Sequence, residues 1–512
     1  MIGKKSKSQR NVLVFFVCND HSAIEVALEA VKQGDNVYAL LCDKSTGICI
    51  RNPYGNGCFC RVCNSCHKKI YKSYLHDRVN YINLSDIISA KDEKESDLYD
   101  MDFTSISELK NIEYHAIEVG YGAFSDFASL TRNVMPDITP DFKEYIQFHI
   151  KNEIKVISAL ERFVKEKKND LIVFHNGRFA FVKPFLGVAV NNGIDYIATE
   201  HFVRENMAYP NFFFNDVPHS VEANIAKAQL LWKEMNPEER TQLGVSFYEK
   251  RRHGIVAGDK VYIDGQVVNK IPDDWDESVE NISIFNSSED EFCAVSKDFD
   301  KKMLFSNQFE ALHAIFEHYK GDRTKHFYLR IHPNLKAVRF KSHLALYNLV
   351  YDNVTIISPE SPISSYSLMD KSDKVIVFNS TMGLESAYWN KPVIALTKFY
   401  STELNLAYSC ETVEDLWKLL DCKDLKPLKN DNAIIIGNYF LRKSPLYKNI
   451  DVVKVKRKFL KKDFTSISIS KIFGSYLLYD ILQYCVSKNF AIFNLASRFK
   501  TIPESKPQTI DG

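Results

Sequence analysis

Short apolar runs, each followed by a helical stretch, recur along most of the chain and constrain its fold more than any other feature. In the first half the runs are "NVLVFFV", "NVYALLC", "LIVFH" and "IDYIAT"; in the second half they are "ISIFNSS", "HFYLRIH", "VTII", "KVIVFNS" and "PVIAL". Runs that are apolar throughout, rather than at alternate positions, are typical of strands buried on both faces of a parallel sheet. The pattern predicts an α/β chain with two doubly wound, Rossmann-like domains.

The domain boundaries follow from where this alternation weakens. A chain of 512 residues is too long for one ordinary core. Between about 236 and 280 the pattern gives way to Gly, Pro and acidic residues, which indicate a linker or surface hairpin. We therefore predict an N-terminal α/β domain over 1–235, this linker over 236–280, a second α/β domain over 281–425 and a C-terminal helical extension over 426–512.

Charge and hydropathy exclude some classes of partner. Lys and Arg number 66 against 65 Asp and Glu, so no global field favours nucleic acid, and no nucleic-acid partner is expected. The basic N-terminus precedes an apolar run that is too short for a signal peptide and that continues into a strand–helix–strand pattern. No stretch reaches the length of a membrane span. We expect a cytoplasmic protein, and the basic stretch "VVKVKRKFLKKDF" leaves open a peripheral contact with an inner membrane or simple helix packing.

Polar residues follow two of the predicted strands in the second half. Arg330 and His332 come at the end of one strand, in "RIHPNL", and Ser380 and Thr381 follow another, in "VIVFNSTMGLES". Ligands of open α/β sheets bind beyond the carboxyl ends of the strands. An arginine fork, a histidine donor and the free N–H groups of a helix N-terminus all suit an anion. The pattern predicts a site for a diphosphate or phosphodiester.

Three more residues are candidates at the same edge. Glu385 lies about one turn into the helix after Thr381, from where it can accept hydrogen bonds from ribose hydroxyls. Ser287 and Ser288 follow the first strand of the second half and are expected to reach the phosphate or an attached sugar. The alternatives are a carboxylate favoured by the helix dipole for Glu385, a helix N-cap for the pair Ser287 and Ser288, an ordinary capping pair for Ser380 and Thr381, and a surface histidine for His332.

The segments "IFNSSEDEF", "RIHPNL" and "SPISSYSLMDKSDKVIVFNSTMGLESAYWNKPVIAL", with "FHNGRFAFVKPFLGVAVNNGIDYIATEH" in the first half, resemble the bacterial capsule polysaccharide biosynthesis proteins. This family includes the Kdo transferases of capsule export systems. The likeness covers most of residues 10–410, and the Ser-Thr-x-Gly-x-Glu segment with its upstream His-Pro is fairly specific. In related enzymes these residues hold the donor, so the resemblance implies that His332, Ser380 and Thr381 hold the donor phosphate and Glu385 the nucleoside.

The resemblance implies a GT-B-like fold, in which the two domains face a cleft, and a glycosyltransferase. Such an enzyme would move a sugar from a nucleotide-sugar donor, CMP- or UDP-linked, onto a glycan or glycolipid acceptor of a bacterial surface polysaccharide. Two alternatives stay open, namely a non-catalytic partner in glycan assembly or export and a nucleotide-sugar epimerase of the same architecture. An Arg, His and helix-terminus cradle can neutralise a leaving phosphate, so catalysis is expected to require no metal or other cofactor.

Polar residues that end strands of the first half are candidates for acceptor activation, which requires a base near the attacking hydroxyl. The candidate bases are His175, Glu200 and His201. Asn176 and Arg178, beside His175, are expected to bind sugar hydroxyls or donor charge. Asp20, after the first strand, is a weaker candidate that also fits a helix cap.

Six of the 11 cysteines crowd into residues 42–67, which we predict to be a loop. In a reducing cytosol such thiols are free or bind metal. Four thiolates satisfy tetrahedral zinc, and the predicted ligands are drawn from Cys49, Cys58, Cys60, Cys63 and Cys66. The spacing lacks the usual long separation between ligand pairs, so an iron–sulfur cluster or free thiols fit as well. Zinc here would be structural and would staple the loop.

Overall fold

The computed structural model describes residues 9–450 apart from 18–19, 48, 51, 53–56, 205–206, 259–262, 264, 337, 339, 429–430 and 444. The chain divides into two compact units. Unit 1 comprises Met1–Thr131, Asp137–Pro218 and Ser444–Gly512, and unit 2 comprises Arg132–Pro136 and His219–Lys443. The basic stretch of the predicted C-terminal extension, residues 452–464, lies outside the described residues.

Unit 1 is built on a six-stranded sheet with the strand order β3-β2-β1-β4-β5-β6. The strands are β1 (Asn11–Phe16), β2 (Asn36–Leu41), β3 (Asn80–Asn83), β4 (Leu171–His175), β5 (Asp195–Arg204) and β6 (Met207–Phe214). The first five are parallel, and β6 pairs with β5 antiparallel. Its helices are α1 (His21–Lys32), α2 (Gly57–Leu75), α3 (Leu84–Ile87), α4 (Ala90–Leu98), α5 (Ile106–Lys110), α6 (Val119–Thr131), α7 (Pro140–Lys167) and α8 (Lys183–Asn191).

Unit 2 repeats this plan with a second six-stranded sheet, ordered β12-β11-β10-β7-β8-β9 and parallel throughout. The strands are β7 (Glu280–Phe285), β8 (Lys325–Arg330), β9 (Val354–Ile357), β10 (Lys374–Val377), β11 (Val393–Ala395) and β12 (Tyr408–Ser409). The helices are α9 (Val221–Lys233), α10 (Pro237–Arg252), α11 (Lys297–Asp300), α12 (Gln308–His318), α13 (Lys341–Leu344), α14 (Ser365–Lys371), α15 (Thr381–Tyr388), α16 (Tyr400–Glu403), α17 (Val413–Asp421) and α18 (Asn432–Leu441). Three short 3-10 turns are η1 (Glu289–Glu291), η2 (Pro333–Leu335) and η3 (Ala345–Asn348).

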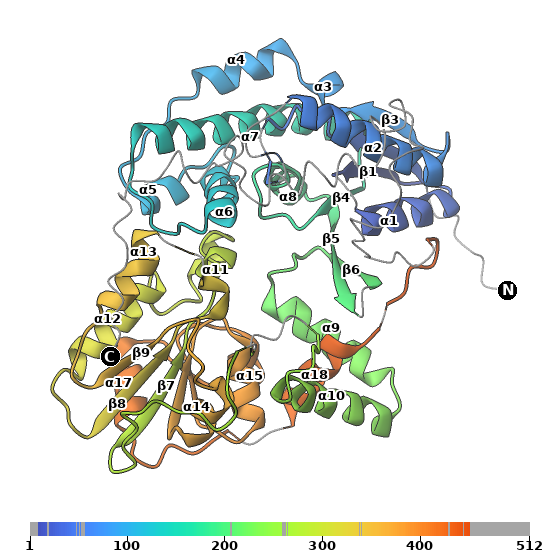
Figure 1. Ribbon diagram of the computed structural model, residues 1–512. Helices are drawn as coiled ribbons and strands as arrows, with labels where there is room; N and C mark the ends of the chain where they lie inside the picture. The colour runs from blue at the N-terminus through green and yellow to red at the C-terminus, as the bar shows by residue number, and fades with distance from the viewer. Residues whose placement is uncertain are drawn as a thin grey trace, which may run out of the picture. The chain divides into compact units, whose positions relative to one another are not determined.

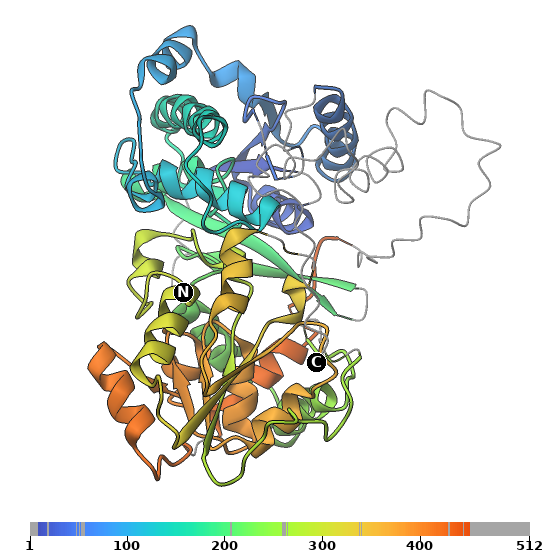
Figure 2. The ribbon, with the colours of Figure 1, turned by 60° about the vertical axis from the view of Figure 1, so that its left-hand side comes forward.

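Helices cover both faces of the sheet in unit 2, as Figure 1 and Figure 2 show. On one face, apolar residues of α12 and α17 form a core with the central strands, among them Leu312, Ile315 and Leu416. On the other face Ser283 of β7 donates a hydrogen bond to the Leu368 carbonyl of α14, at 3.5 Å. Burial on both faces explains why the strands read as continuous apolar runs.

Both sheets have the Rossmann order, in which the first strand lies between the second and the fourth. The predicted fold class, α/β with two doubly wound Rossmann-like units, is therefore confirmed. Two such units in one chain are the constituents of the GT-B architecture. In each sheet the topological switch point, where ligands of such folds bind, lies between the first and fourth strands. These strands are β1 and β4 in unit 1, and β7 and β10 in unit 2.

The segment predicted as a linker differs in the structure. Its first part is α10, a helix of 16 residues in unit 2 that packs on α18. Tyr248 donates a hydrogen bond to the Ala433 carbonyl at 2.6 Å. A Cβ added at Gly244 would lie 2.3 Å from the Ile434 carbonyl oxygen, so the absence of a side chain there permits the close approach of the two helices. α18, predicted as part of a C-terminal extension, belongs to unit 2.

Candidate functional site

Three loops with polar side chains meet the carboxyl edge of the sheet in unit 2. They follow β7, β8 and β10 and hold Ser287, Ser288, His332 and Ser380. The other three residues predicted for the donor site lie beside these loops, Arg330 as the last residue of β8 and Thr381 and Glu385 in α15. Because β7 lies between β8 and β10, His332 and Ser380 do not follow adjacent strands. Their strand ends are two inter-strand spacings apart, about 10 Å.

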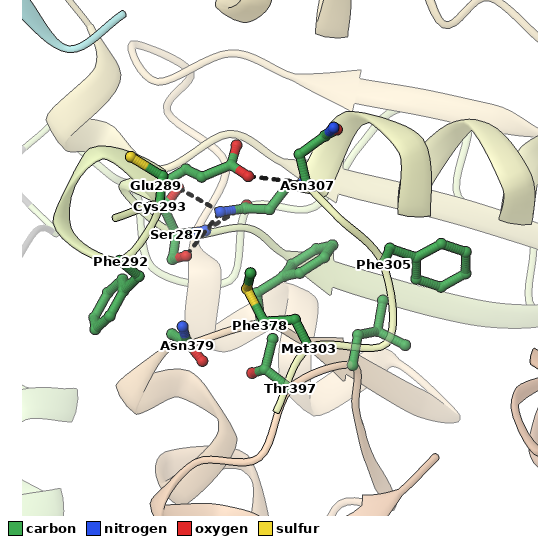
Figure 3. A pocket seen from close by; sticks show the side chains of 12 residues that line it. Ser287, Glu289, Phe292, Cys293, Met303, Phe305, Asn307, Phe378, Asn379 and Thr397 are labelled. Atoms are coloured by element: carbon green, nitrogen blue, oxygen red, sulfur yellow. Dashed lines mark hydrogen bonds between the residues drawn. The ribbon is translucent and has the colours of Figure 1, made fainter. Parts of the chain in front are cut away.

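The loop after β7 is hydrogen-bonded to the loop after β8. Asn286 Oδ1 accepts a hydrogen bond from the His332 backbone N–H at 2.7 Å. Asn334 Nδ2 donates to Ser288 Oγ at 3.3 Å, and Ser288 Oγ donates to Asp290 Oδ1 at 2.6 Å. Ser287 is held by Gln308, whose Nε2 donates to its Oγ at 2.9 Å (Figure 3). The loops after β7 and β8 thus form one hydrogen-bonded edge.

The histidine ring is oriented by its own turn. His332 precedes η2, and its Nδ1 accepts a hydrogen bond from the Asn334 backbone N–H at 3.1 Å. A ring whose Nδ1 accepts carries its proton on Nε2 when neutral. This arrangement leaves Nε2 as the donor atom, which is the form that the predicted phosphate contact needs.

The helix after β10 begins as the sequence predicts. Ser380 is the N-cap of α15, and its Oγ accepts a hydrogen bond from the Met382 N–H at 3.2 Å. Thr381 Oγ1 accepts from Arg251 Nη2 at 3.4 Å. The capping alternative for Ser380 therefore holds, and it is compatible with an anion at the N-terminus, where further N–H groups and the helix dipole act.

Glu385 has partners that the sequence could not indicate. It is 1% exposed, and its carboxylate accepts hydrogen bonds from Arg251 Nε at 3.1 Å and from the Tyr366 hydroxyl. Burial and this carboxylate raise the pKa of Tyr366, so the phenol stays protonated and donates. Arg251 was missed because it lies in the last turn of α10, within the predicted linker. The nucleoside contact of Glu385 stays a prediction. The structure shows a buried ion pair with Arg251 that connects α15 to α10, and a hydrogen bond from Tyr366 that connects α15 to α14.

Arg330 is also engaged within unit 2. It is 2% exposed, and its Nη1 and Nη2 donate to the carbonyls of Ser358 and Ser361 at 2.7 and 3.3 Å. Burial lowers its pKa to about 10. The guanidinium fixes the loop after β9 against the end of β8. Its predicted phosphate contact stays a prediction.

In unit 1 the predicted base candidates form one cluster, with His175 at the end of β4 and Glu200 and His201 within β5, which continues to Arg204 rather than ending at them as predicted. His175 Nε2 lies 4.0 Å from Glu200 Oε1, and His175 Nδ1 lies 3.8 Å from Asp20 Oδ2. Asn176 Nδ2 donates to Glu200 Oε2 at 2.9 Å. His201 Nδ1 lies 3.7 Å from Glu200 Oε1. The His175 ring thus lies between two carboxylates, at the switch point of the sheet.

The local backbone explains how these side chains meet. Asn176 and Gly177 both have positive φ angles, 60° and 97°, which turn the chain sharply after β4. Asp20 caps α1 by accepting from the Ala23 N–H at 2.9 Å, and its other oxygen accepts from Thr199 Oγ1 at 2.6 Å. The capping alternative for Asp20 is therefore correct, and the same carboxylate also lies beside His175.

The electrostatics of this cluster keep Glu200 ionised. Burial raises the pKa of Glu200, but the effects of His175, the Asn176 amide and His201 outweigh that of burial. The pKa of Glu200 is therefore lowered overall. Its side chain is 25% exposed. A carboxylate that stays charged can stabilise a protonated imidazole beside it.

Arg178 lies apart from this cluster. Its Nη2 donates to Ser129 Oγ of α6 at 3.0 Å, and its guanidinium carbon lies 4.6 Å from the centre of the Phe179 ring. The contacts of Arg178 are thus with α6 and its own turn, whereas its neighbour Asn176 joins the Glu200 cluster. The sugar contact predicted for Arg178 stays a prediction.

The cysteine-rich segment is helical from Gly57 onward, which corrects the predicted loop over 42–67. Asn52 Nδ2 donates to Cys60 Sγ at 3.0 Å, and His67 Nδ1 lies 2.6 Å from the Cys63 carbonyl oxygen. Among the residues that the structure describes, no group of three or more His, Cys, Asp or Glu could hold a metal ion. The side chain of Cys58 lies outside the described residues. Zinc stays a prediction.

Within the described part of the chain, none of the helices is long and apolar enough to cross a membrane.

Comparison with known proteins gives one family match. Residues 302–403 match the model of the family described as capsule polysaccharide biosynthesis protein. No curated protein matches the chain significantly.

Several solved structures are similar at low identity. The KpsC β-Kdo 2,4 transferase of Thermosulfurimonas dismutans is 17% identical over 53% of this chain and 79% of that one, with a TM-score of 0.33. The β-Kdo 2,7 transferase of the same KpsC is 13% identical over 55% of this chain and 80% of that one, with a TM-score of 0.32. The UDP-GlcNAc 2-epimerase of Neisseria meningitidis bound to UDP-GlcNAc is 12% identical over 84% of this chain and 97% of that one, with a TM-score of 0.26. TM-scores this low carry no argument.

The matched segment begins before α12 and ends with α16, and it includes Arg330, His332, Ser380, Thr381 and Glu385. The segments quoted from the second half for the family resemblance fall largely within it. Residues 302–403 of this chain are therefore similar to the capsule polysaccharide biosynthesis family, in agreement with the resemblance.

Proposed function

We propose that the protein is a glycosyltransferase that moves a sugar from a nucleotide-sugar donor, CMP- or UDP-linked, onto a bacterial surface polysaccharide. One observation carries the proposal. The capsule-biosynthesis segment holds the loops of His332 and of Ser380 and Thr381, and both lie at the carboxyl edge of a Rossmann-ordered sheet. That edge is where folds of this kind bind nucleotides.

The donor phosphate is proposed to lie at this edge. The Nε2 proton of His332 and the first N–H groups of α15 would donate hydrogen bonds to phosphate oxygens, and the helix dipole would favour the negative charge. Arg251 and Glu385 hold α15 in place through Thr381 and the buried ion pair. Arg330 holds the loop after β9 by donating hydrogen bonds to two of its backbone carbonyls.

The acceptor is proposed to be activated by His175 of unit 1. The acceptor oxygen attacks the anomeric carbon of the donor sugar and passes its proton to the imidazole. The bond from that carbon to the phosphate oxygen breaks, and its electron pair leaves on the nucleotide. Glu200 and Asp20, whose oxygens lie 4.0 and 3.8 Å from the ring nitrogens, would stabilise the imidazolium that forms.

A cytoplasmic location is part of the proposal, since nucleotide sugars are made and used there. The basic residues between 454 and 462 are the candidate contact with the inner membrane.

The test is a transfer assay with the purified full chain. CMP-, UDP-, GDP- and dTDP-linked sugars are supplied with and without isolated capsule oligosaccharide, and both nucleotide release and the mass of the glycan are measured. We expect glycan growth with one donor and its loss in His332→Ala and His175→Ala. His326→Ala is the matched control, because His326 lies at the opposite end of β8 and hydrogen-bonds Thr355.

Two results would refute the proposal. Conversion of the nucleotide sugar without any acceptor would identify an epimerase. No transfer with any donor, while capsule production in cells still depends on the chain, would favour the non-catalytic alternative. Normal transfer by His332→Ala would contradict only the role assigned to His332.

A further inference from the structure

The last residues that the structure describes, 445–450, belong to unit 1 and lie along α1; we call this segment the C-terminal strap. In Figure 1 it is the red end of the ribbon, beside α1. Ile450 is 5% exposed and belongs to the apolar core that α1 forms with β1 and β2. Tyr447 packs against the same core. Two side chains of the strap are therefore anchored in the body of unit 1.

A buried carboxylate of α1 holds the backbone of the strap. Glu25 is 6% exposed, and its Oε1 accepts a hydrogen bond from the Lys448 N–H at 2.7 Å. Its Oε2 accepts from the Asn449 N–H at 3.0 Å, and the Asn449 side-chain amide donates to Oε1, also at 3.0 Å. A buried carboxylate needs donors of this kind, and hydrogen bonds to a charged acceptor are strong. Loss of Glu25 would therefore release the strap from α1.

The strap reaches the Glu200 cluster through one serine. Ser22 is 2% exposed, and its Oγ donates to the Glu200 carbonyl at 3.0 Å and lies 3.3 Å from the Tyr447 hydroxyl. A carbonyl only accepts and a serine hydroxyl carries one proton, so Tyr447 is the donor in the second contact. Burial raises the pKa of Tyr447 to about 12, and the nearby carboxylates of Asp20 and Glu25 act in the same direction. The phenol therefore keeps its proton and donates it to Ser22.

Glu200 lies just beyond the part of β5 that β4 holds. The register of the two strands ends at Thr199, opposite His175, and on its other side β5 pairs with β6, where Glu200 lies opposite Asn211. The hydrogen bond from Ser22 is thus an added constraint on the main chain of Glu200. Because Glu200 Oε1 lies 4.0 Å from His175 Nε2, a shift of that main chain would change the distance between the carboxylate and the imidazole.

We propose that Tyr447 is a positioning residue, which acts through Ser22 to fix the main chain of Glu200 and hence the carboxylate beside the candidate base. The C-terminal strap is then part of the acceptor-activating site, although Tyr447 and Ser22 are 425 residues apart in the sequence. The inference rests on the proposed function in one respect, namely that His175 is the base. Tyr447 and Ser22 touch neither donor nor acceptor and affect the reaction only through Glu200.

Matched variants of the full chain test the inference. Tyr447→Phe removes the hydroxyl and keeps the ring in the core, and Ser22→Ala removes the group to which that hydroxyl donates. Tyr99→Phe is the control, because Tyr99 also lies in unit 1 and its hydroxyl donates to the Glu113 carbonyl, at 2.8 Å, outside the Glu200 cluster. Thermal unfolding of each variant checks that it is folded.

The first measurement needs no activity. The imidazoles of isotope-labelled histidine are observed by NMR, and the His175 signal is assigned by its loss in His175→Gln. We expect Tyr447→Phe and Ser22→Ala to shift this signal in the same direction, and Tyr99→Phe to leave it in place. Because Tyr447 acts through Ser22, the two shifts should be much less than additive in the double variant. Additive shifts, or an unmoved signal, would overturn the inference.

The second measurement is transfer kinetics. We expect Tyr447→Phe to lower kcat about two- to tenfold, as the loss of one hydrogen bond predicts. The KM for the donor should not change, because the donor is proposed to bind unit 2. Glu25→Ala should lower kcat at least as much, and amide hydrogen exchange at Lys448 and Asn449 should become about tenfold faster or more.

The outcomes separate the two proposals. Unchanged exchange in Glu25→Ala, or an unchanged kcat in Tyr447→Phe, would contradict the role of the strap while leaving the proposed function intact. If the wild type transfers no sugar but the His175 signal responds to Tyr447→Phe and Ser22→Ala without additivity, the link from the strap to the cluster holds and the proposed function alone is refuted.

Discussion

Replacing Glu385 by Leu is expected to cost unit 2 about 3–5 kcal/mol of unfolding free energy. Glu385 is 1% exposed, and its carboxylate balances the Arg251 guanidinium, which is 7% exposed. The substitution leaves that charge buried without its anion and leaves the Tyr366 hydroxyl without its acceptor. Domains are typically stable by about 5–15 kcal/mol, so this loss is a large fraction of the total.

The assay is urea unfolding of the full chain, followed by tryptophan fluorescence and circular dichroism, with the midpoint and slope fitted separately. Glu249→Leu is the matched control, because Glu249 is an exposed residue on the same helix as Arg251, and it should change stability by about 0.5 kcal/mol or less. A cost below about 1 kcal/mol for Glu385→Leu would refute the interpretation of this pair as a buried anchor of α15.

Three further predictions concern other buried contacts. Burial raises the pKa of Glu200, but neighbouring groups lower it further, to below its usual value of 4.5. The charged carboxylate therefore stabilises the protein above that pH, and this contribution is lost as the pH falls through the lowered pKa. Glu200→Gln should destabilise the protein more at pH 6 than at the acid end of a pH series of urea unfolding curves. Arg330→Lys should cost about 2 kcal/mol in the same assay, because an ammonium cannot reach both loop carbonyls in the geometry of the guanidinium. Gly244→Ala should cost about 1–3 kcal/mol, because the added methyl group would overlap the Ile434 carbonyl, and a wild-type midpoint would contradict the packing of α10 on α18.

The strands could be predicted because each carries its own local signal. All nine apolar runs identified in the sequence contain or overlap a strand of one of the two sheets. The edge strand β6 was not predicted, since "MAYPNFFF" contains Pro210, which reads as a break rather than a strand. α10 was also missed, because most of its residues are charged or polar and its buried side falls on Gly244, Phe247, Tyr248 and Arg251 alone.

The candidate sites were predictable as residues at strand ends but not as contacts. His175, Asn176 and Glu200 come together because β4 and β5 are neighbours, which the order of runs suggests. The partners of Glu385 come from residues 251 and 366, and no local pattern pairs them. The same is true of Arg330, whose partners follow the next strand. The end of each apolar run shows which residues follow a strand, whereas the hydrogen-bond partners of those residues depend on the tertiary packing.

A combined variant separates the two roles available to Glu385, namely nucleoside contact and anchoring of α15. In Arg251→Met/Glu385→Leu/Tyr366→Phe the ion pair and its tyrosine donor are replaced by apolar groups of similar size, which is often neutral for stability. Thr381 Oγ1 loses its arginine donor in the same variant. The single Glu385→Leu change should be strongly destabilising and the combined one much less so, with a coupling energy of about 2 kcal/mol or more in the cycle. If Glu385 only anchors α15, the combined variant recovers donor affinity along with stability. If its carboxylate contacts ribose hydroxyls, stability returns while nucleotide affinity stays low, and the prediction made from the family resemblance would hold against the structural interpretation.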